Sequence, residues 1–306
     1  MSLPFTAVTD DHVAPFQIEG EPVRGRIVRL GGTIDTILAA HAYPEAVANL
    51  LGETCALAAL VGSNLKFEGR MIVQAQGDGP VRYVVCDYDT SGHIRGYCRY
   101  DETAVAEVGK GFIRPGAKTL LGQGVFIMTV DQGPDMDRYQ GVTAIDGETL
   151  ALCAEQYFAQ SEQTPTRVRL AVGQVVNAEG THWRAGGMLI QNIAEDEARG
   201  STAEAWTRTQ AFFETVGEDE LIDPTLTSEG LLFRLFHEDG VRVFEPKELK
   251  AVCRCSKDRI IGVLASFSPE DQADMVEDDG KVRVTCEYCA SVYALTPGQL
   301  IAAAKA

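Results

Sequence analysis

The chain has 306 residues, of which 45% are hydrophobic and 23% charged, as in ordinary globular proteins. Its formal net charge of −17 argues against nucleic acid or an anionic membrane as the main partner. No apolar run reaches the roughly 18 residues of a membrane span, and the acidic N-terminus is unlike a secretory signal. Eight cysteines without such a signal predict a cytoplasmic protein with reduced thiols.

Residues 1–194 are predicted to form an α+β core with an antiparallel sheet, of which residues 1–20 are an extension. Val23–Leu30 predicts a strand, and residues 44–64 predict a buried helix because they are apolar on nearly every side. Hairpins next to helices, without a repeated βαβ rhythm, favour this fold class. The expected hairpins pair 82–87 with 93–100, 125–130 with 138–145, and 167–176 with 182–190.

Residues 195–250 differ in composition and predict an acidic helical linker. They contain 14 Asp and Glu against 6 Lys and Arg, a net charge of −8. Bulky apolar residues recur at helical spacing, and a short helix is expected over 228–237. One interpretation is a pair of surface helices packed on the core. The other is a conditionally folded segment, because its apolar surface is small and its acids repel one another.

Residues 251–306 are predicted to form a small zinc module. Cys253 and Cys255 are followed, after 30 residues, by Cys286 and Cys289. Two close pairs at this separation are typical of a tetrahedral zinc site with four thiolate ligands. Both thiolates of the C-x-C pair can reach one metal, because alternate residues of an extended chain share a face. A module this small has a thin core and needs such a staple.

Local signals predict the elements of this module. Ser268 and Pro269 are typical of a helix start, and Gly280 is expected to end that helix. Short strands are expected over 282–285 and 291–293. Nearby bases would offset the negative charge of a zinc ion with four thiolates; they are Arg254, Lys257, Arg259, Lys281 and Arg283.

The residues alone leave three functions open. The four cysteines are either a structural staple in a binding module or a switch that an oxidant takes apart. The C-x-x-C of Cys286 and Cys289 also allows a thiol oxidoreductase, although a C-x-x-C at a helix start after a strand is missing. No catalytic constellation is evident, so we expect no enzyme. The scattered histidines are His12, His41, His93, His182 and His237, and the cysteines expected in the core are Cys55, Cys86, Cys98 and Cys153.

Several blocks of the core sequence point to one known family. They are 65–70, 74–80, 95–97, 139–141, 157–166, 185–187 and Gln191. With the C-x-C…C-x-x-C tail, which is the most specific mark, the chain resembles the redox-regulated chaperone family Hsp33 over nearly its whole length. It departs from the family pattern at the N-terminal extension and at Ile193–Ala194, where the family often has a proline. Neither departure affects the cysteines.

The resemblance implies an ATP-independent holdase that is inactive while reduced and bound to one zinc ion per chain. Oxidation would pair Cys253 with Cys255 and Cys286 with Cys289, release the zinc and unfold the module and linker. The apolar surface thus exposed would bind unfolded or oxidatively damaged proteins, and the active form would be a homodimer. Candidate client-binding residues of the linker are Trp206, Phe212, Phe213, Val216, Leu232, Phe233 and Phe236.

Overall fold

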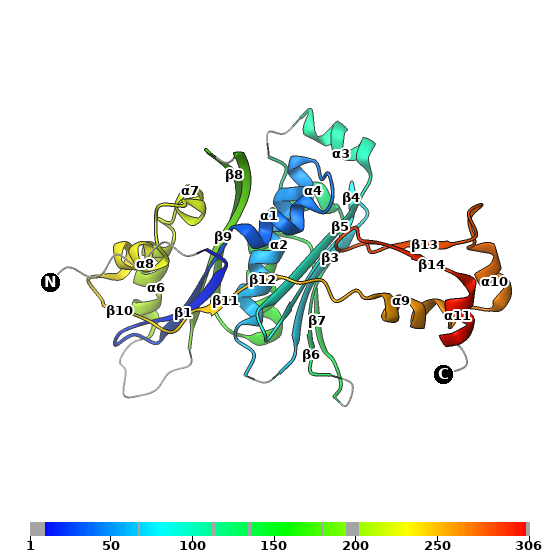
Figure 1. Cartoon of the computed structure of the whole chain (residues 1–306). Coiled ribbons are helices and arrows are strands. Elements are labelled where there is room, and N and C mark those ends of the chain that lie inside the picture. The colour runs from blue at the N-terminus through cyan, green and yellow to red at the C-terminus, as the bar shows by residue number, and fades with distance from the viewer. Residues whose placement is uncertain are drawn as a thin grey trace. The chain divides into compact units, whose positions relative to one another are not determined.

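The chain divides into two compact units, Met1–Ala251 and Val252–Ala306, in its computed structural model (Figure 1). The structure describes residues 10–66, 68–111, 114–133, 136–178, 180–193 and 202–303. Helices and mainly antiparallel strands are mixed along the chain, which confirms the predicted α+β class.

Both units are built from short helices and strands. In the first unit these are β1 (His12–Ile18), β2 (Val23–Leu30), α1 (Gly32–Ala39), α2 (Glu45–Gly62), β3 (Arg70–Gly77), β4 (Val81–Asp89), β5 (His93–Tyr100), α3 (Glu102–Gly109), α4 (Ala117–Leu121), β6 (Gly124–Asp131), β7 (Tyr139–Ala144), α5 (Leu150–Tyr157), the π-helix η1 (Phe158–Glu162), β8 (Thr166–Asn177), β9 (Gly180–Asn192), α6 (Thr202–Phe213), α7 (Glu218–Ile222), α8 (Ser228–Phe236), β10 (Val241–Val243), β11 (Lys247–Glu248) and β12 (Lys250–Ala251). In the second they are α9 (Lys257–Leu264), α10 (Pro269–Asp274), β13 (Val282–Thr285), β14 (Val292–Leu295) and α11 (Pro297–Ala303).

One sheet of the first unit, which we call sheet A, has apolar side chains on both faces. Its strands follow the order β10-β1-β2-β9-β8, and β11 also pairs with β1. Successive side chains of a strand point to opposite faces. Val13 and Val28 accordingly belong to the core around α2, whereas Phe16 and Ile27 pack with α6, α7 and α8. Sheet A therefore depends on the linker helices to cover its second face.

Strand β1 corrects the expected N-terminal extension, because residues 12–18 pair with β2, β10 and β11 inside sheet A. Pro15 made this segment unlike a strand, since proline cannot donate a ladder hydrogen bond. It is accommodated because β10 pairs with residues 16–18 and β11 with residues 12 and 13, so Pro15 lies between the two pairings. Residues 1–9 lie outside the described part of the chain.

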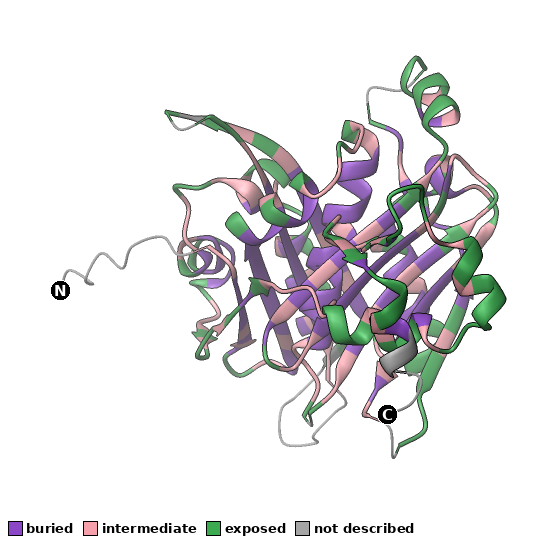
Figure 2. Ribbon diagram, turned by 45° about the vertical axis from the view of Figure 1, so that its right-hand side comes forward, coloured by how far each residue is buried: buried purple, intermediate pink, exposed green. Residues whose placement is uncertain are grey.

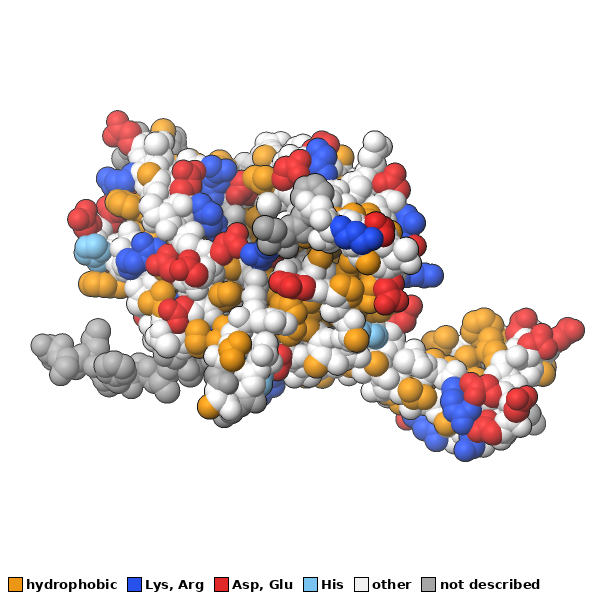
Figure 3. Space-filling model, turned by 90° about the horizontal axis from the view of Figure 1, so that it is seen from above, with side chains coloured by type: hydrophobic (Ala, Val, Ile, Leu, Met, Phe, Trp, Pro, Cys, Tyr) orange, Lys and Arg blue, Asp and Glu red, His pale blue; other side chains and the backbone are white. Residues whose placement is uncertain are grey.

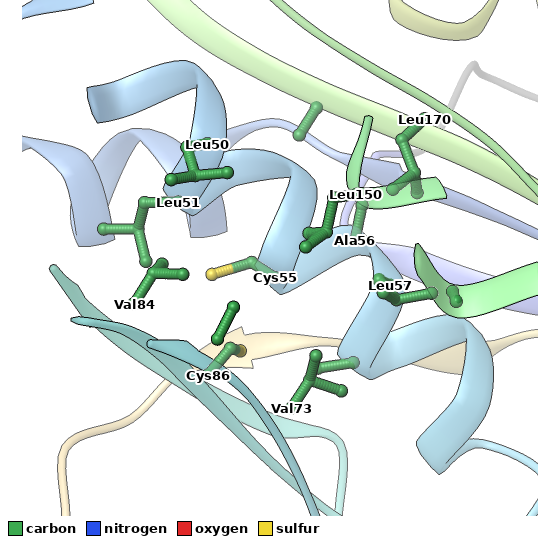
Figure 4. Close-up of a cluster of buried hydrophobic side chains, with 14 of the residues drawn as sticks. Leu50, Leu51, Cys55, Ala56, Leu57, Val73, Val84, Cys86, Leu150 and Leu170 are labelled. Carbon is green, nitrogen blue, oxygen red and sulfur yellow. The ribbon is translucent and has the colours of Figure 1, made fainter. Parts of the chain in front are cut away.

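Helix α2 fills the space between sheet A and the second sheet, whose order is β12-β5-β4-β3-β6-β7. Leu51 and Cys55 point toward Val84 and Cys86 of β4 (Figure 4). The helix was predicted from its nearly continuous apolar surface, and the structure confirms that it is buried. By length and composition it would suffice to cross a membrane, but 83% of that window is buried inside the fold.

The linker contains short strands as well as the expected helices. Helix α8 confirms the helix predicted over 228–237, but β10, β11 and β12 follow it and pair with β1 or β5. Val241–Val243 alternates apolar and polar residues, as a strand does, yet three residues are too few for that signal to stand out in sequence. Residues 195–201 lie outside the described range.

Helix α7 lies very close to sheet A at Gly186. A Cβ atom built at this glycine would be 2.1 Å from the carbonyl oxygen of Leu221. Only a residue without a side chain therefore allows the backbone of α7 to approach β9 in this way.

Replacing Gly186 by alanine should loosen the linker. Because the added methyl group overlaps a main-chain oxygen, we expect a cost of about 1–3 kcal/mol in the docking of α7. Limited proteolysis of the reduced protein should then cut residues 202–250 faster than in the wild type. Gly109→Ala is the matched control, because nothing lies within 4 Å of its Cβ position. Equal cleavage rates in the two variants would contradict this account.

Candidate metal centre

Four cysteines from two separate segments come together in the second unit. Cys253 and Cys255 follow strand β12, and Cys286 and Cys289 lie in the turn that joins β13 to β14. Their sulfur atoms all lie within 4.8 Å of one another. This is the group of ligands expected from the sequence. Among the described residues it is also the one group of three or more such side chains close enough to hold a metal ion.

The distances between the sulfur atoms suit a tetrahedral ion. A metal–sulfur bond of about 2.3 Å places two thiolates about 3.8 Å apart in a tetrahedron. Cys253 Sγ and Cys286 Sγ are 3.7 Å apart, and Cys255 Sγ and Cys289 Sγ are 3.4 Å apart. Each of these close contacts joins the C-x-C segment to the C-x-x-C segment. An ion bound here would therefore connect the two halves of the unit.

The turn that carries Cys286 and Cys289 is shaped by its own backbone. The amide of Cys286 donates to the carbonyl of Ser291, and the amide of Ala290 donates to the carbonyl of Cys286, each at 2.9 Å. Ala290 adopts a left-handed conformation with φ of 55°. Because the C-x-x-C lies in a hairpin turn and not at a helix start, the usual context of a thiol oxidoreductase is absent.

Cys255, Cys286 and Cys289 differ in acidity before any metal binds. Burial raises the pKa of Cys255 to about 12 and also raises the pKa of Cys286. Burial acts in the same direction on Cys289, but hydrogen bonds with Ser291 and with the neighbouring thiols outweigh it and lower its pKa to about 6. Cys289 is therefore the thiolate available near neutral pH, and a bound cation would favour deprotonation of the others.

The apolar core of the second unit is small. Its buried hydrophobic residues are Leu264, Val282, Leu295 and Leu300. Helices α9 and α10 are largely exposed (Figure 2). Helix α10 begins at Pro269 with Ser268 as its cap, as predicted, but it ends at Asp274. Gly280 instead adopts φ of 78° in the turn before β13. So little buried surface agrees with a unit that depends on a staple.

One of the bases expected beside the cysteines has other partners. The Arg283 guanidinium pairs with Asp279 and Glu277. These carboxylates neutralise its charge within the same turn, so Arg283 does not serve mainly to offset the thiolates as we had expected.

The linker residues proposed to bind clients lie mostly inside the fold. Phe213, Val216, Leu232 and Phe236 are at most 3% exposed and belong to the apolar cluster on sheet A. The rings of Phe236 and Phe16 are stacked with centroids 6.0 Å apart. Two others, Trp206 and Phe212, are half-buried, whereas Phe233 is 64% exposed. In this conformation the linker hides most of its own apolar face together with that of sheet A.

Basic residues of the core hold the acidic linker, a feature that sequence reasoning missed. Arg114 Nη1 donates to Glu218 Oε2 at 2.6 Å, and Arg167 Nη2 donates to Glu214 Oε1 at 3.0 Å. On the face drawn in Figure 3, acidic and basic side chains lie interspersed. Exposed ion pairs of this kind contribute about 1 kcal/mol or less each. They offset the repulsion among the linker acids without fixing the linker permanently.

The fold and the cluster define an α+β protein with a C-terminal four-cysteine centre, and the comparisons with known proteins agree. The sequence profile described as "Hsp33 protein" matches residues 11–296. The chain is 72% identical to the 33 kDa chaperonin of Caulobacter vibrioides strain NA1000, over 96% of this chain and 97% of that protein. It is 35% identical to the 33 kDa chaperonin of Proteus mirabilis, over 94% and 93% of the two chains.

A solved structure shares the fold. The 33 kDa chaperonin (heat shock protein 33 homolog) from Thermotoga maritima matches with a TM-score of 0.77 at 24% identity, covering 96% of this chain and 98% of that chain. The chain belongs to the Hsp33 family of chaperones. The resemblance seen in the sequence is thereby confirmed.

Removing one ligand tests the metal centre. We expect Cys289→Ser to leave the purified, reduced protein with well under one metal ion per chain, because three thiolates hold the ion far less tightly than four. Inductively coupled plasma mass spectrometry measures the content. Cys153→Ala removes a buried cysteine of the first unit and should keep the full content. Equal metal content in the two variants would rule out Cys289 as a ligand.

Proposed function

We propose that this chain is a redox-regulated, ATP-independent holdase that binds zinc at Cys253, Cys255, Cys286 and Cys289. The reduced, zinc-bound form is inactive because the linker covers the apolar face of sheet A. Oxidation removes the zinc, unfolds the second unit and frees the linker. The chaperone family supports this proposal, and so does the position of Cys253 and Cys255, two of the four clustered cysteines, directly after a segment that hides an apolar surface.

Zinc supplies a link between the two cysteine segments, and oxidation abolishes the donors that hold it. Each pair of zinc-bound thiolates gives two electrons to one molecule of hydrogen peroxide, which takes two protons from the solvent, so that one disulfide and two molecules of water form. We propose the pairs Cys253–Cys255 and Cys286–Cys289. Each pair closes a loop of a few residues and removes little entropy from the unfolded chain. Neither pair joins the two segments, so the second unit loses its long-range staple.

The chain itself couples the two events. Cys253 lies two residues after Ala251, the last residue of β12. Just before β12, Leu249 is 1% exposed; its amide donates to Asp11 O at 2.7 Å, and its carbonyl accepts from Thr33 Oγ1 at 3.2 Å. This short anchor holds the end of the linker. An unfolded chain attached at residue 252 favours fraying of β12, which is only two residues long.

The released linker would expose a large apolar surface bordered by charges. Such a surface can bind unfolded proteins and remain soluble without ATP. The linker residues Phe213, Val216, Leu232 and Phe236 would then become accessible, together with sheet A. We further propose that the active form is a homodimer, that it acts in the cytoplasm, and that nucleic acid and membranes are not its partners, in keeping with a net charge of −17.

Peroxide treatment tests the switch. We expect the oxidised protein to release about one zinc ion per chain and to suppress aggregation of a heat-denatured client, whereas the reduced protein suppresses it weakly. Zinc release is followed with a chromogenic chelator and aggregation by light scattering. Dithiothreitol with added zinc should reverse both changes. Equal protection by the reduced and oxidised forms would leave the zinc a purely structural role.

Peptide mapping of the oxidised protein tests the proposed pairing. In the structure the close contacts are Cys253 with Cys286 and Cys255 with Cys289, so cross-pairing is the competing outcome. Cross-paired disulfides would keep the two segments joined and the second unit folded. We expect the local pairs, accompanied by loss of protease resistance in residues 252–303. Cross-pairs with an intact unit would contradict the proposed release.

A further inference from the structure

We propose that the face of sheet A beneath α6, α7 and α8 binds clients through their main-chain carbonyl groups as well as through their apolar side chains. This inference rests on the proposed function, and it adds the chemistry by which unrelated sequences are recognised. The evidence is the manner in which the same face holds its present occupant, the linker.

Three arginines of this face donate hydrogen bonds to main-chain carbonyls of the linker. Arg169 Nη2 donates to Glu214 O at 2.7 Å. Arg184 Nε donates to Ile222 O at 2.7 Å, and Arg29 Nη1 donates to Asp223 O at 3.0 Å. None of these three bonds uses a linker side chain. They would form equally well with any polypeptide that offered unpaired carbonyls in the same places.

Arg29 has two nitrogen donors that form no hydrogen bond. It is 2% exposed, and its Nε and Nη2 atoms are buried without a hydrogen-bond partner. Like-charged Arg184 lies near it, and the carboxylates of Asp10, Asp223 and Glu220 are close enough to stabilise its charge in part. A buried guanidinium with unused donors is unfavourable unless acceptors are supplied. This side chain is therefore poised to take further carbonyls when the linker is replaced by a longer or differently placed segment.

On the same face, Gly186 allows a backbone to lie directly on the sheet, and Gly173 leaves room for an apolar side chain. A Cβ at Gly186 would be 2.1 Å from Leu221 O, and a Cβ at Gly173 would be 2.8 Å from Ile222 Cδ1. Beside these glycines the same face has an apolar floor, because Ala171 lies opposite Gly186 and Met188 follows it two residues along β9. Glycine gives access, arginine binds the carbonyls, and the floor accepts apolar side chains of many shapes. A surface of this composition suits the main chain of an unfolded protein.

A simpler interpretation is that Arg29 and Arg184 only satisfy the last carbonyls of α7, since helix C-termini leave such groups unpaired. The two interpretations agree for the reduced form. They differ once the linker has left, because only a client-binding role predicts that the arginines affect the affinity of the oxidised form. The experiment therefore uses the oxidised full chain, with linker release verified by proteolysis.

The probe is fluorescently labelled, reduced and carboxymethylated α-lactalbumin, which stays unfolded. The test protein carries Arg29→Met, Arg169→Met and Arg184→Met, which keep the apolar stems and remove the donors. We expect its Kd for the probe to rise at least tenfold over oxidised wild type. The corresponding triple lysine variant keeps the positive charges but not the several donors of each guanidinium. Its Kd for the probe should lie between those of the wild type and the methionine variant. Binding of the neutral dye Nile red, which reports the apolar floor, should change less than twofold.

The control variant removes three exposed arginines of the other sheet and its loops: Arg82→Met, Arg99→Met and Arg138→Met. It should bind the probe as wild type does, which separates a local effect from a general loss of positive charge. If the triple test variant fails to fold, Arg169→Met alone, at a half-buried position, should still raise the Kd about threefold. An unchanged Kd in the folded variants would overturn the inference. Failure of oxidised wild type to bind the probe would overturn the proposed function instead.

Discussion

The structure depends on the cover that the linker provides for sheet A. This sheet has one apolar face packed on α2 and a second one, including Phe16 and Ile27, that would be open to water without α6, α7 and α8. Burying that second face stabilises the docked linker by the hydrophobic effect. Under the proposed function, the same surface would bind unfolded proteins once the linker has left it. One set of side chains would then stabilise the proposed resting form and bind clients in the proposed active form.

The proposed release of the linker requires that the linker is not docked too firmly on sheet A. The linker carries a net charge of −8, and its acids repel one another while docked. Exposed pairs such as Arg114–Glu218 and Arg167–Glu214 offset this repulsion but are individually weak. Gly186 in turn brings α7 close enough for its carbonyls to be bound. The free energy of linker docking is thus a sum of modest terms. Under the proposed function, a change at the end of the linker would be enough to release it.

Signals local in sequence were sufficient for much of the fold. Helix α2, the three hairpins of the core and the four cysteines were predicted because each is marked by its own residues. Strand β1 was not predicted, because Pro15 is unusual inside a strand. Strands β10 to β12 were not predicted either, because two or three residues show almost no periodicity. The arginine contacts could not be predicted at all. Arg29 and the carbonyl it binds are 194 positions apart, and nothing local marks such a pair.

The second unit has only a small apolar core, and its two cysteine segments meet in a cluster of four sulfur atoms. Its buried core has few apolar side chains, and sulfur contacts of 3.7 Å and 3.4 Å join Cys253 to Cys286 and Cys255 to Cys289 across the two segments. A metal ion would hold all four at once, whereas local disulfides would hold each segment only to itself. Oxidation under the proposed pairing therefore adds covalent bonds and yet lowers the order of the unit. New disulfides can accompany a loss of order only in a domain that is stabilised mainly by the ion and not by its apolar core.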